Sequence, residues 1–252
     1  MGYNYTKALA MTGAAAAAAW LVYYFLKDDN QEDENDLFKK EYDPSDMAAA
    51  SKVVEKMTKT DVIDLLAKIA ANQDKAKSLL QTLVSEIMGS DFKDTMLDVY
   101  HRVVKDVPND PLKARGLTLF DLDYLVERYQ NDPTVRSHIM AMINLPTGET
   151  PEDEHDIVPD EIVNVYKFML KELQDIQTTQ QPLTMQPNLN SNAASIAVQA
   201  IIAAKVQKKF GYTSMQIDRA ITRHQAELGM NTKFARFAMQ IQTEMTEITG
   251  TG

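Results

Sequence analysis

The chain has 252 residues and a mass of 28.3 kDa, which is enough for one large domain or two small ones. Its net charge of −10 argues against nucleic acid as the main partner, because binding of DNA or RNA depends on Lys and Arg neutralising phosphates, and equally against docking on an anionic lipid surface. The absence of cysteine excludes disulfides, thiolate metal sites and cysteine nucleophiles.

The N-terminal residues 1–27 predict a membrane anchor. Residues 8–26 contain no charged side chain, and these 19 residues would form a helix of about 28 Å, close to the thickness of a bilayer core. Charged residues follow at once on both sides, Lys7 before the stretch and Lys27 after it. The residues that would drive insertion are apolar or aromatic: Leu9, Met11, Trp20, Leu21, Val22, Phe25 and Leu26.

Three other interpretations of this segment stay open. A cleaved signal peptide would need small residues after the apolar run, where the chain has Tyr-Tyr-Phe-Leu. A buried core helix would suit the alanines but not the abrupt charged flanks. A myristoylated amphipathic helix would start at Gly2, although Tyr3 is bulky for that signal.

Small residues within the predicted anchor fall on one helical face at the spacing that lets two membrane helices approach closely. This predicted helix-packing face consists of Ala10, Gly13, Ala14, Ala17 and Ala18. We therefore expect a second transmembrane helix as one possible partner, besides the lipid bilayer itself.

Residues 28–43 are expected to form an acidic linker, with eight acidic and two basic residues. The segment lacks the glycine and the final glutamate of a calcium-binding loop, so a solvated charge run is the preferred interpretation. Its apolar residues Leu37, Phe38 and Tyr42 are candidate contacts for a partner.

Residues 44–176 predict a lobe of several helices, because apolar residues recur at three- and four-residue spacing between capping residues and breakers. Thr118 is expected to cap one of these helices, and Ser90 or Asp91 another. The expected helices span 47–57, 60–69, 73–88, 92–105, 119–130, 134–144 and 159–176.

Residues 177–190 are rich in Gln, Asn, Thr and Pro and predict a second polar linker. Residues 191–252 then predict a C-terminal three-helix bundle, with helices over 193–210, 213–229 and 231–248. Phe234 and Phe237 belong either to its core or to a contact with a neighbouring subunit. This part has seven basic and four acidic residues, and Lys205, Lys208 and Lys209 are further candidate partner contacts.

The sequence offers no catalytic, cofactor-binding or metal-ligating motif. The four histidines lack ligand spacing, the serines lack a nucleophile elbow, and the nine glycines form no phosphate-binding loop. We therefore expect no enzyme activity, no cofactor and no small-molecule substrate.

Taken together, the sequence predicts an all-α fold with a single-pass N-terminal anchor. The leading hypothesis is a membrane-anchored structural subunit, a spacer or cement protein among neighbouring protein subunits. A minor capsid protein tied to an internal viral membrane and an accessory subunit of an organellar membrane complex both fit. The alternative is a membrane-tethered adaptor whose helical lobe binds proteins or peptides.

Overall fold

A computed structural model describes residues 52–143, 156–179, 183–186 and 188–250. Within these ranges the chain forms helices and no strands, which confirms the predicted all-α class. The predicted anchor and the acidic linker lie outside the described residues.

Threonine-led capping boxes fix the start of four helices. In each, the threonine hydroxyl accepts the N–H three residues on, and the side chain of that residue accepts the threonine N–H. The four helices are α4 (Lys59–Gly89), α5 (Met96–Asp106), α6 (Leu119–Tyr129) and α10 (Ser214–Arg223). Their caps are Thr58, Thr95, Thr118 and Thr213. The predicted cap at Thr118 is confirmed.

Several helix boundaries differ from the sequence prediction, and the helix expected over 213–229 is divided at His224 into two, α10 and α11 (Gln225–Met230). The helices expected over 60–69 and 73–88 are one continuous helix, α4. Ala70 and Ala71, which lie between the two expected segments, are strong helix formers and continue the helix. The next helix begins at Met96 instead of Phe92, since Ser90 and Asp91 end α4 and Thr95 caps α5. Asp91 and Phe92 both have left-handed backbone angles, with φ of 54° and 60°.

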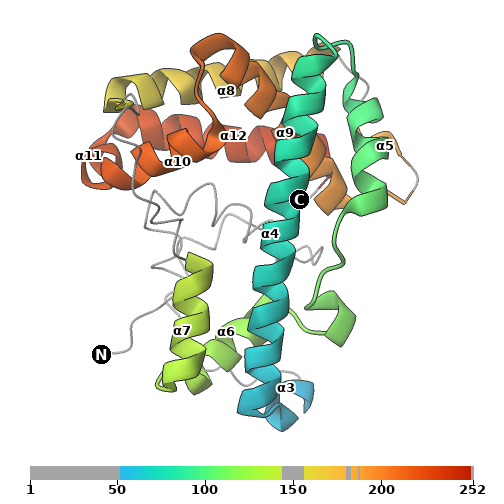
Figure 1. Ribbon diagram of the computed structural model, residues 1–252, viewed down its shortest axis with the longest axis vertical. Coiled ribbons are helices and arrows are strands. Elements are labelled where there is room, and N and C mark those ends of the chain that lie inside the picture. The colour runs from blue at the N-terminus through green and yellow to red at the C-terminus, as the bar shows by residue number, and fades with distance from the viewer. Residues whose placement is uncertain (1–51, 144–155, 180–182, 187, 251–252) are drawn as a thin grey trace.

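The first half of α4 belongs to a small core at one end of the molecule (Figure 1). The other elements of this core are α3 (Lys52–Lys56), the short 3-10 helix η3 (Lys113–Arg115) with its flanks, α6 and α7 (Pro133–Ile143). Its buried residues from α4 end at Ile69.

The second half of α4, from Ala76 on, belongs to a large core at the other end. It is built with α5, α8 (Pro159–Thr179), α9 (Ser191–Phe210), α10, α11 (Gln225–Met230) and α12 (Thr232–Thr249). Helix α9 is apolar around most of its circumference and buries residues on all sides, as expected of a helix enclosed by others. It packs against α4, α5 and α8.

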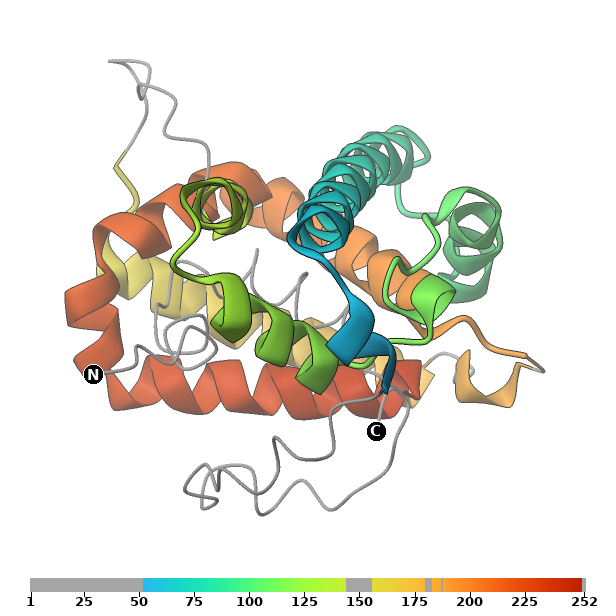
Figure 2. The same cartoon turned by 90° about the horizontal axis from the view of Figure 1, so that it is seen from below.

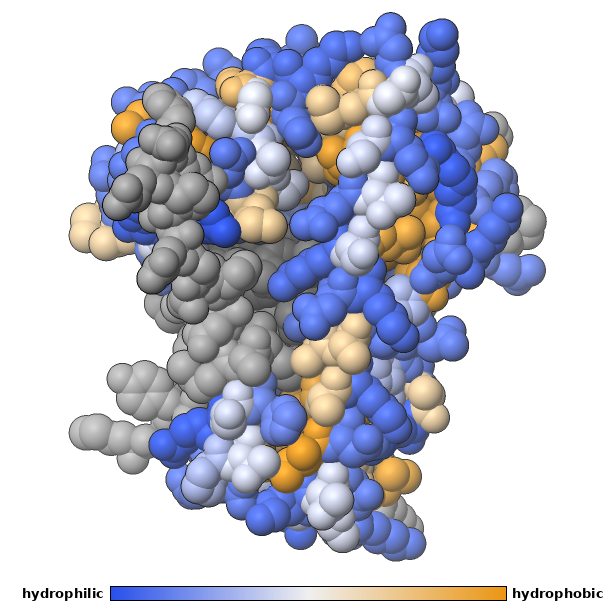
Figure 3. Space-filling view, in the orientation of Figure 1, coloured by the Kyte–Doolittle hydropathy of each residue, from blue (hydrophilic) through white to orange (hydrophobic). Residues whose placement is uncertain are grey.

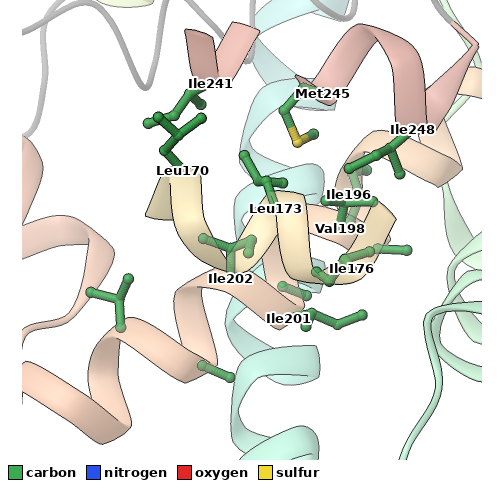
Figure 4. Packing of buried hydrophobic residues seen from close by; sticks show 14 of the residues in the cluster. Leu170, Leu173, Ile176, Ile196, Val198, Ile201, Ile202, Ile241, Met245 and Ile248 are labelled. Atoms are coloured by element: carbon green, nitrogen blue, oxygen red, sulfur yellow. The ribbon is translucent and has the colours of Figure 1, made fainter. Parts of the chain in front are cut away.

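Helices α8 and α12 form a parallel pair, side by side in both views (Figures 1 and 2). The side-chain amides of Gln174 and Gln177 donate to Glu244 and Glu247, so the two helices run in the same direction with a constant offset of 70 residues. Figure 4 shows the apolar layer between them, where Leu170 and Leu173 face Ile241 and Met245.

This pairing corrects the predicted domain organisation. The helices of residues 191–250 do not form a bundle of their own, because α12 packs mainly on α8 and α9 packs mainly on α4 and α5. One core therefore extends across the boundary that was expected near residues 177–190. The apolar stripes of α9 and α12 are buried, whereas Met215 at the start of α10 is 41% exposed. A stripe does not specify which other stripe covers it.

The described residues of the predicted polar linker 177–190 likewise pack on the helices around them. Helix α8 continues to Thr179, and the 3-10 helix η4 (Leu183–Met185) buries Leu183 to 1% exposure. The backbone N–H of Asn190 donates to the hydroxyl of Tyr100 at 3.0 Å, and the Asn190 side chain caps α9.

Candidate interaction surface

Many of the predicted site residues fall outside the described residues. These are the anchor residues, the small-residue packing face, and Leu37, Phe38 and Tyr42. None of the helices in the described ranges combines the length and the apolar character that a membrane crossing requires. Within the same ranges no group of three or more His, Cys, Asp or Glu side chains could hold a metal ion.

Phe234 and Phe237 are core residues in this fold. Their exposed fractions are 7% and 9%, and the Phe234 ring lies 4.6 Å from the buried Tyr166 ring of α8, centroid to centroid. The interpretation of these two side chains as contacts for a neighbouring subunit is therefore wrong, because both are buried in the large core.

Lys205, Lys208 and Lys209 lie together at the C-terminal end of α9, where they form what we call the basic corner. Lys205 Nζ pairs with Glu172 Oε2 of α8 at 2.7 Å. Lys208 Nζ lies 3.4 Å from Asp91 Oδ1 and 4.3 Å from the centroid of the Phe92 ring. The three lysines therefore connect the end of α9 to α8 and to the turn after α4.

Aromatic rings support the ammonium group of Lys209. Its Nζ lies 4.1 Å from the Phe168 ring centroid and 5.5 Å from that of Phe210. These two rings meet edge to face at 5.5 Å, and Phe210 stacks on Tyr212 at 6.3 Å. The Tyr212 hydroxyl lies 3.2 Å from Glu161 Oε1. A cation held over aromatic faces keeps its charge while its side chain is restricted in position.

The turn that carries Asp91 and Phe92 ends α4 in a Schellman arrangement. The N–H of Phe92 donates to the carbonyl of Ile87, and the N–H of Asp91 donates to the carbonyl of Met88. Asp91 occupies the left-handed position that usually holds glycine, and its carboxylate lies at the negative end of the helix dipole. Both the left-handed backbone and the position of the carboxylate are unfavourable for Asp91. The same turn places Asp91 and Phe92 beside Lys208.

The three lysines differ in how firmly they are held. Lys205 and Glu172 are both largely covered, whereas the side chains of Lys208 and Asp91 are 58% and 82% exposed. An ion pair between such exposed groups contributes little, about 0–1 kcal/mol. Lys208 and Lys209 can therefore engage another anion without loss of the fold.

The sequence pointed to the lysines but not to the residues around them. Glu172, Phe168, Asp91 and Phe92 come from other elements, and no local pattern joins them to α9. The excess of basic residues after Ser191 was the available signal.

A half-buried carboxyl group lies on α10, between residues of the large core. Burial raises the pKa of Asp218 to about 7, although the ammonium of Lys77 on α4 opposes the shift. Burial and the nearby Asp218 also raise the pKa of the Tyr166 hydroxyl. On α6, burial and the neighbouring Glu127 raise the pKa of Asp123 to about 6.

Exposed apolar side chains are few and are spread over several elements, with Phe120 on α6, Met230 on α11 and Met239 on α12 the most exposed. Figure 3 shows one face of the molecule as mainly hydrophilic, with apolar residues in seams beside α4. Single exposed apolar residues are normal on soluble surfaces. Among the described residues, the basic corner is therefore the candidate surface that combines exposed charge with side chains held by ion pairs and aromatic rings.

No known protein family, curated protein or solved structure matches this chain.

Proposed function

We propose that the chain is a non-enzymatic, membrane-anchored structural subunit of a larger assembly. The observation that carries the proposal is the stretch of 19 uncharged residues over 8–26, with charged residues directly on both sides. A rigid helical body on such an anchor would act as a spacer or cement protein. A minor capsid protein at an internal viral membrane and an accessory subunit of an organellar complex remain the two examples of this class.

The body has features that suit such a role. Helix α4 runs through both cores and would hold two surfaces at a fixed separation, because a 31-residue helix spans about 46 Å.

The anchor is tested by placing a charge at its centre. Ala16→Arg is expected to weaken insertion by about 3 kcal/mol, so that alkaline carbonate should release the variant from membranes. Ala71→Arg, at an exposed position of α4, is the matched control and should stay in the membrane pellet. Release of the unaltered protein by carbonate would contradict the proposal.

One observation favours the alternative, a membrane-tethered adaptor. The large core closes within the chain and joins α4, α5 and α8 to the last four helices, so the body has the interior of a domain that folds alone. Residues 44–252 expressed without the anchor distinguish the two. Cooperative unfolding of a soluble monomer would support the adaptor, whereas insolubility or a non-cooperative transition would support the assembly subunit.

A further inference from the structure

The basic corner lacks a full complement of acids within the described residues. Lys205 has Glu172, but Lys208 shares only the exposed Asp91, and the contacts of Lys209 are with the rings of Phe168 and Phe210. On α8, the exposed Lys167 and Lys171 stand on either side of Phe168 in the sequence. Together with the three lysines of the corner these are five lysines, against three carboxylates at the corner, those of Glu172, Asp91 and Glu161, in a chain whose net charge is −10.

The same chain contains a segment of complementary charge. Residues 28–36, Asp-Asp-Asn-Gln-Glu-Asp-Glu-Asn-Asp, carry six carboxylates and no basic residue. The two lysines of the acidic linker, Lys39 and Lys40, come only afterwards. The negative charge is thus concentrated in the part of the linker farthest along the chain from α3.

The length of the intervening chain decides which carboxylates can reach the lysines. Lys52 begins α3 at one end of α4, and the basic corner adjoins the turn at the other end, about 46 Å away along α4 (Figure 1). At about 3.4 Å per residue, Asp43 reaches no more than about 31 Å from Lys52, whereas Asp36 reaches about 54 Å. Residues 28–36 can therefore span the molecule, and residues 41–43 cannot.

We propose that the acidic segment 28–36 docks on the basic corner of its own chain, with residues 37–51 as the tether. Lys208 and Lys209 would provide the main contacts, since aromatic rings already restrict their side chains and less freedom is lost when they bind an anion. A tether of this length keeps the segment at a millimolar effective concentration, so several weak ion pairs suffice. This inference does not depend on the proposed function.

The test uses the full-length chain in a neutral detergent and a carbodiimide, which joins a carboxylate to a lysine only where the two are in contact. Mass spectrometry should find the carboxylates of residues 28–36 joined to Lys208 and Lys209. We expect the yield of these crosslinks to fall at least fivefold in 1 M salt, where the screening length is about 3 Å. Glu41 and Asp43 should give no such crosslinks.

Charge-reversed variants provide the matched comparison. Lys208→Glu with Lys209→Glu removes both amines, and residues 28–36 should then form no crosslinks to Lys205, the lysine that remains at the corner. Adding Asp33→Lys and Glu34→Lys to the same chain should restore crosslinks between the two sites, now with the charges exchanged. Lys233→Glu with Arg236→Glu alters two exposed cations of α12 and should leave the crosslinks unchanged. The Lys205–Glu172 crosslink reports in every variant that the large core is folded.

Several outcomes would overturn the proposal. Equal crosslinking of residues 28–36 to the exposed Lys75 and Lys233 would mean that the contacts are unspecific. Crosslinks found only between heavy and light chains in an isotopically mixed sample would identify a second copy as the occupant. If no crosslink forms in neutral nanodiscs and phosphatidylserine shields Lys208 and Lys209 from an acylating reagent, the occupant is lipid.

Discussion

Among the carboxyl groups of the described residues, Asp218 has the pKa that folding raises most. Its pKa in the folded chain is about 7, against a usual value of 3.8, so between these pH values the folded state holds a proton that the unfolded state has lost. The stability it contributes is complete below about pH 4 and is lost as the pH rises through about 7. A shift from 3.8 to about 7 corresponds to roughly 4 kcal/mol.

Asp218→Asn should remove this dependence, because the amide is neutral at every pH. Urea unfolding at pH 5 and pH 8 should show the variant gaining stability relative to the parent at the higher pH. Asp98→Asn is the contrasting control: hydrogen bonds from Thr95 lower the pKa of Asp98, so that substitution should destabilise at both pH values. An Asp218→Asn variant that follows the parent at both pH values would contradict the assignment.

Two helix-ending glycines differ in their surroundings and allow a paired test. Gly211 and Gly250 end α9 and α12 with φ of 77° and 66°, so alanine at either is expected to cost about 1 kcal/mol. At Gly250 an added Cβ would also lie 3.1 Å from Cγ2 of Thr184, whereas at Gly211 it would meet nothing. The melting temperature of Gly250→Ala should be lower than that of Gly211→Ala. Thr184→Ser removes the methyl group that the new Cβ would meet, so it should reduce this difference in melting temperature.

At the level of helices, the α8–α12 interface is the contact whose loss should matter most. Phe237→Ala removes a buried ring of α12 from the large core that α8 and α12 share, and is expected to cost about 3–5 kcal/mol. Phe120→Ala deletes the same group at a position that is 75% exposed and should change stability by less than 0.5 kcal/mol. Denaturant midpoints measured for the two variants give the comparison.

The consequence of Phe237→Ala also separates one shared core from an independent bundle. In the shared core, hydrogen exchange should accelerate in α8 and α9 together with α12, because all three contribute buried residues to it. Acceleration in α9 to α12 with no change in α8 would instead support the independent three-helix bundle that the sequence predicted.

The helices were largely predictable because their signals are local. Thr118, Pro159 and Gly211 each mark an end with a cap or a stop, and the apolar spacing identified the buried side of α12 correctly. Their partners were not predictable, because the stripe on α8 would fit α12, α9 or α10 equally well. The site followed the same rule: Lys208 was found from its charge, whereas Asp91 and Phe92 reach it only through the fold.

For the whole molecule, the two cores are joined by α4 between Ile69 and Ala76. Ala71→Pro in this connection removes a helix hydrogen bond and should cost about 3 kcal/mol. It should also uncouple the cores, so that calorimetry resolves two transitions, with the small core melting first because it buries less. Ala71→Gly should cost about 1 kcal/mol and retain the transition pattern of the parent. A single sharp transition in the proline variant would mean that other contacts couple the cores.

The parallel α8–α12 pair has a consequence for the order in which the chain is made. Residues of α8 meet partners that lie 70 positions later, for example Gln174 with Glu244, so the partner is synthesised about 4–14 seconds after them at 5–20 residues per second. Helix α8 can form within microseconds, long before α12 exists. The apolar face of Tyr166, Leu170 and Leu173 therefore stays without its α12 partner on the nascent chain for seconds.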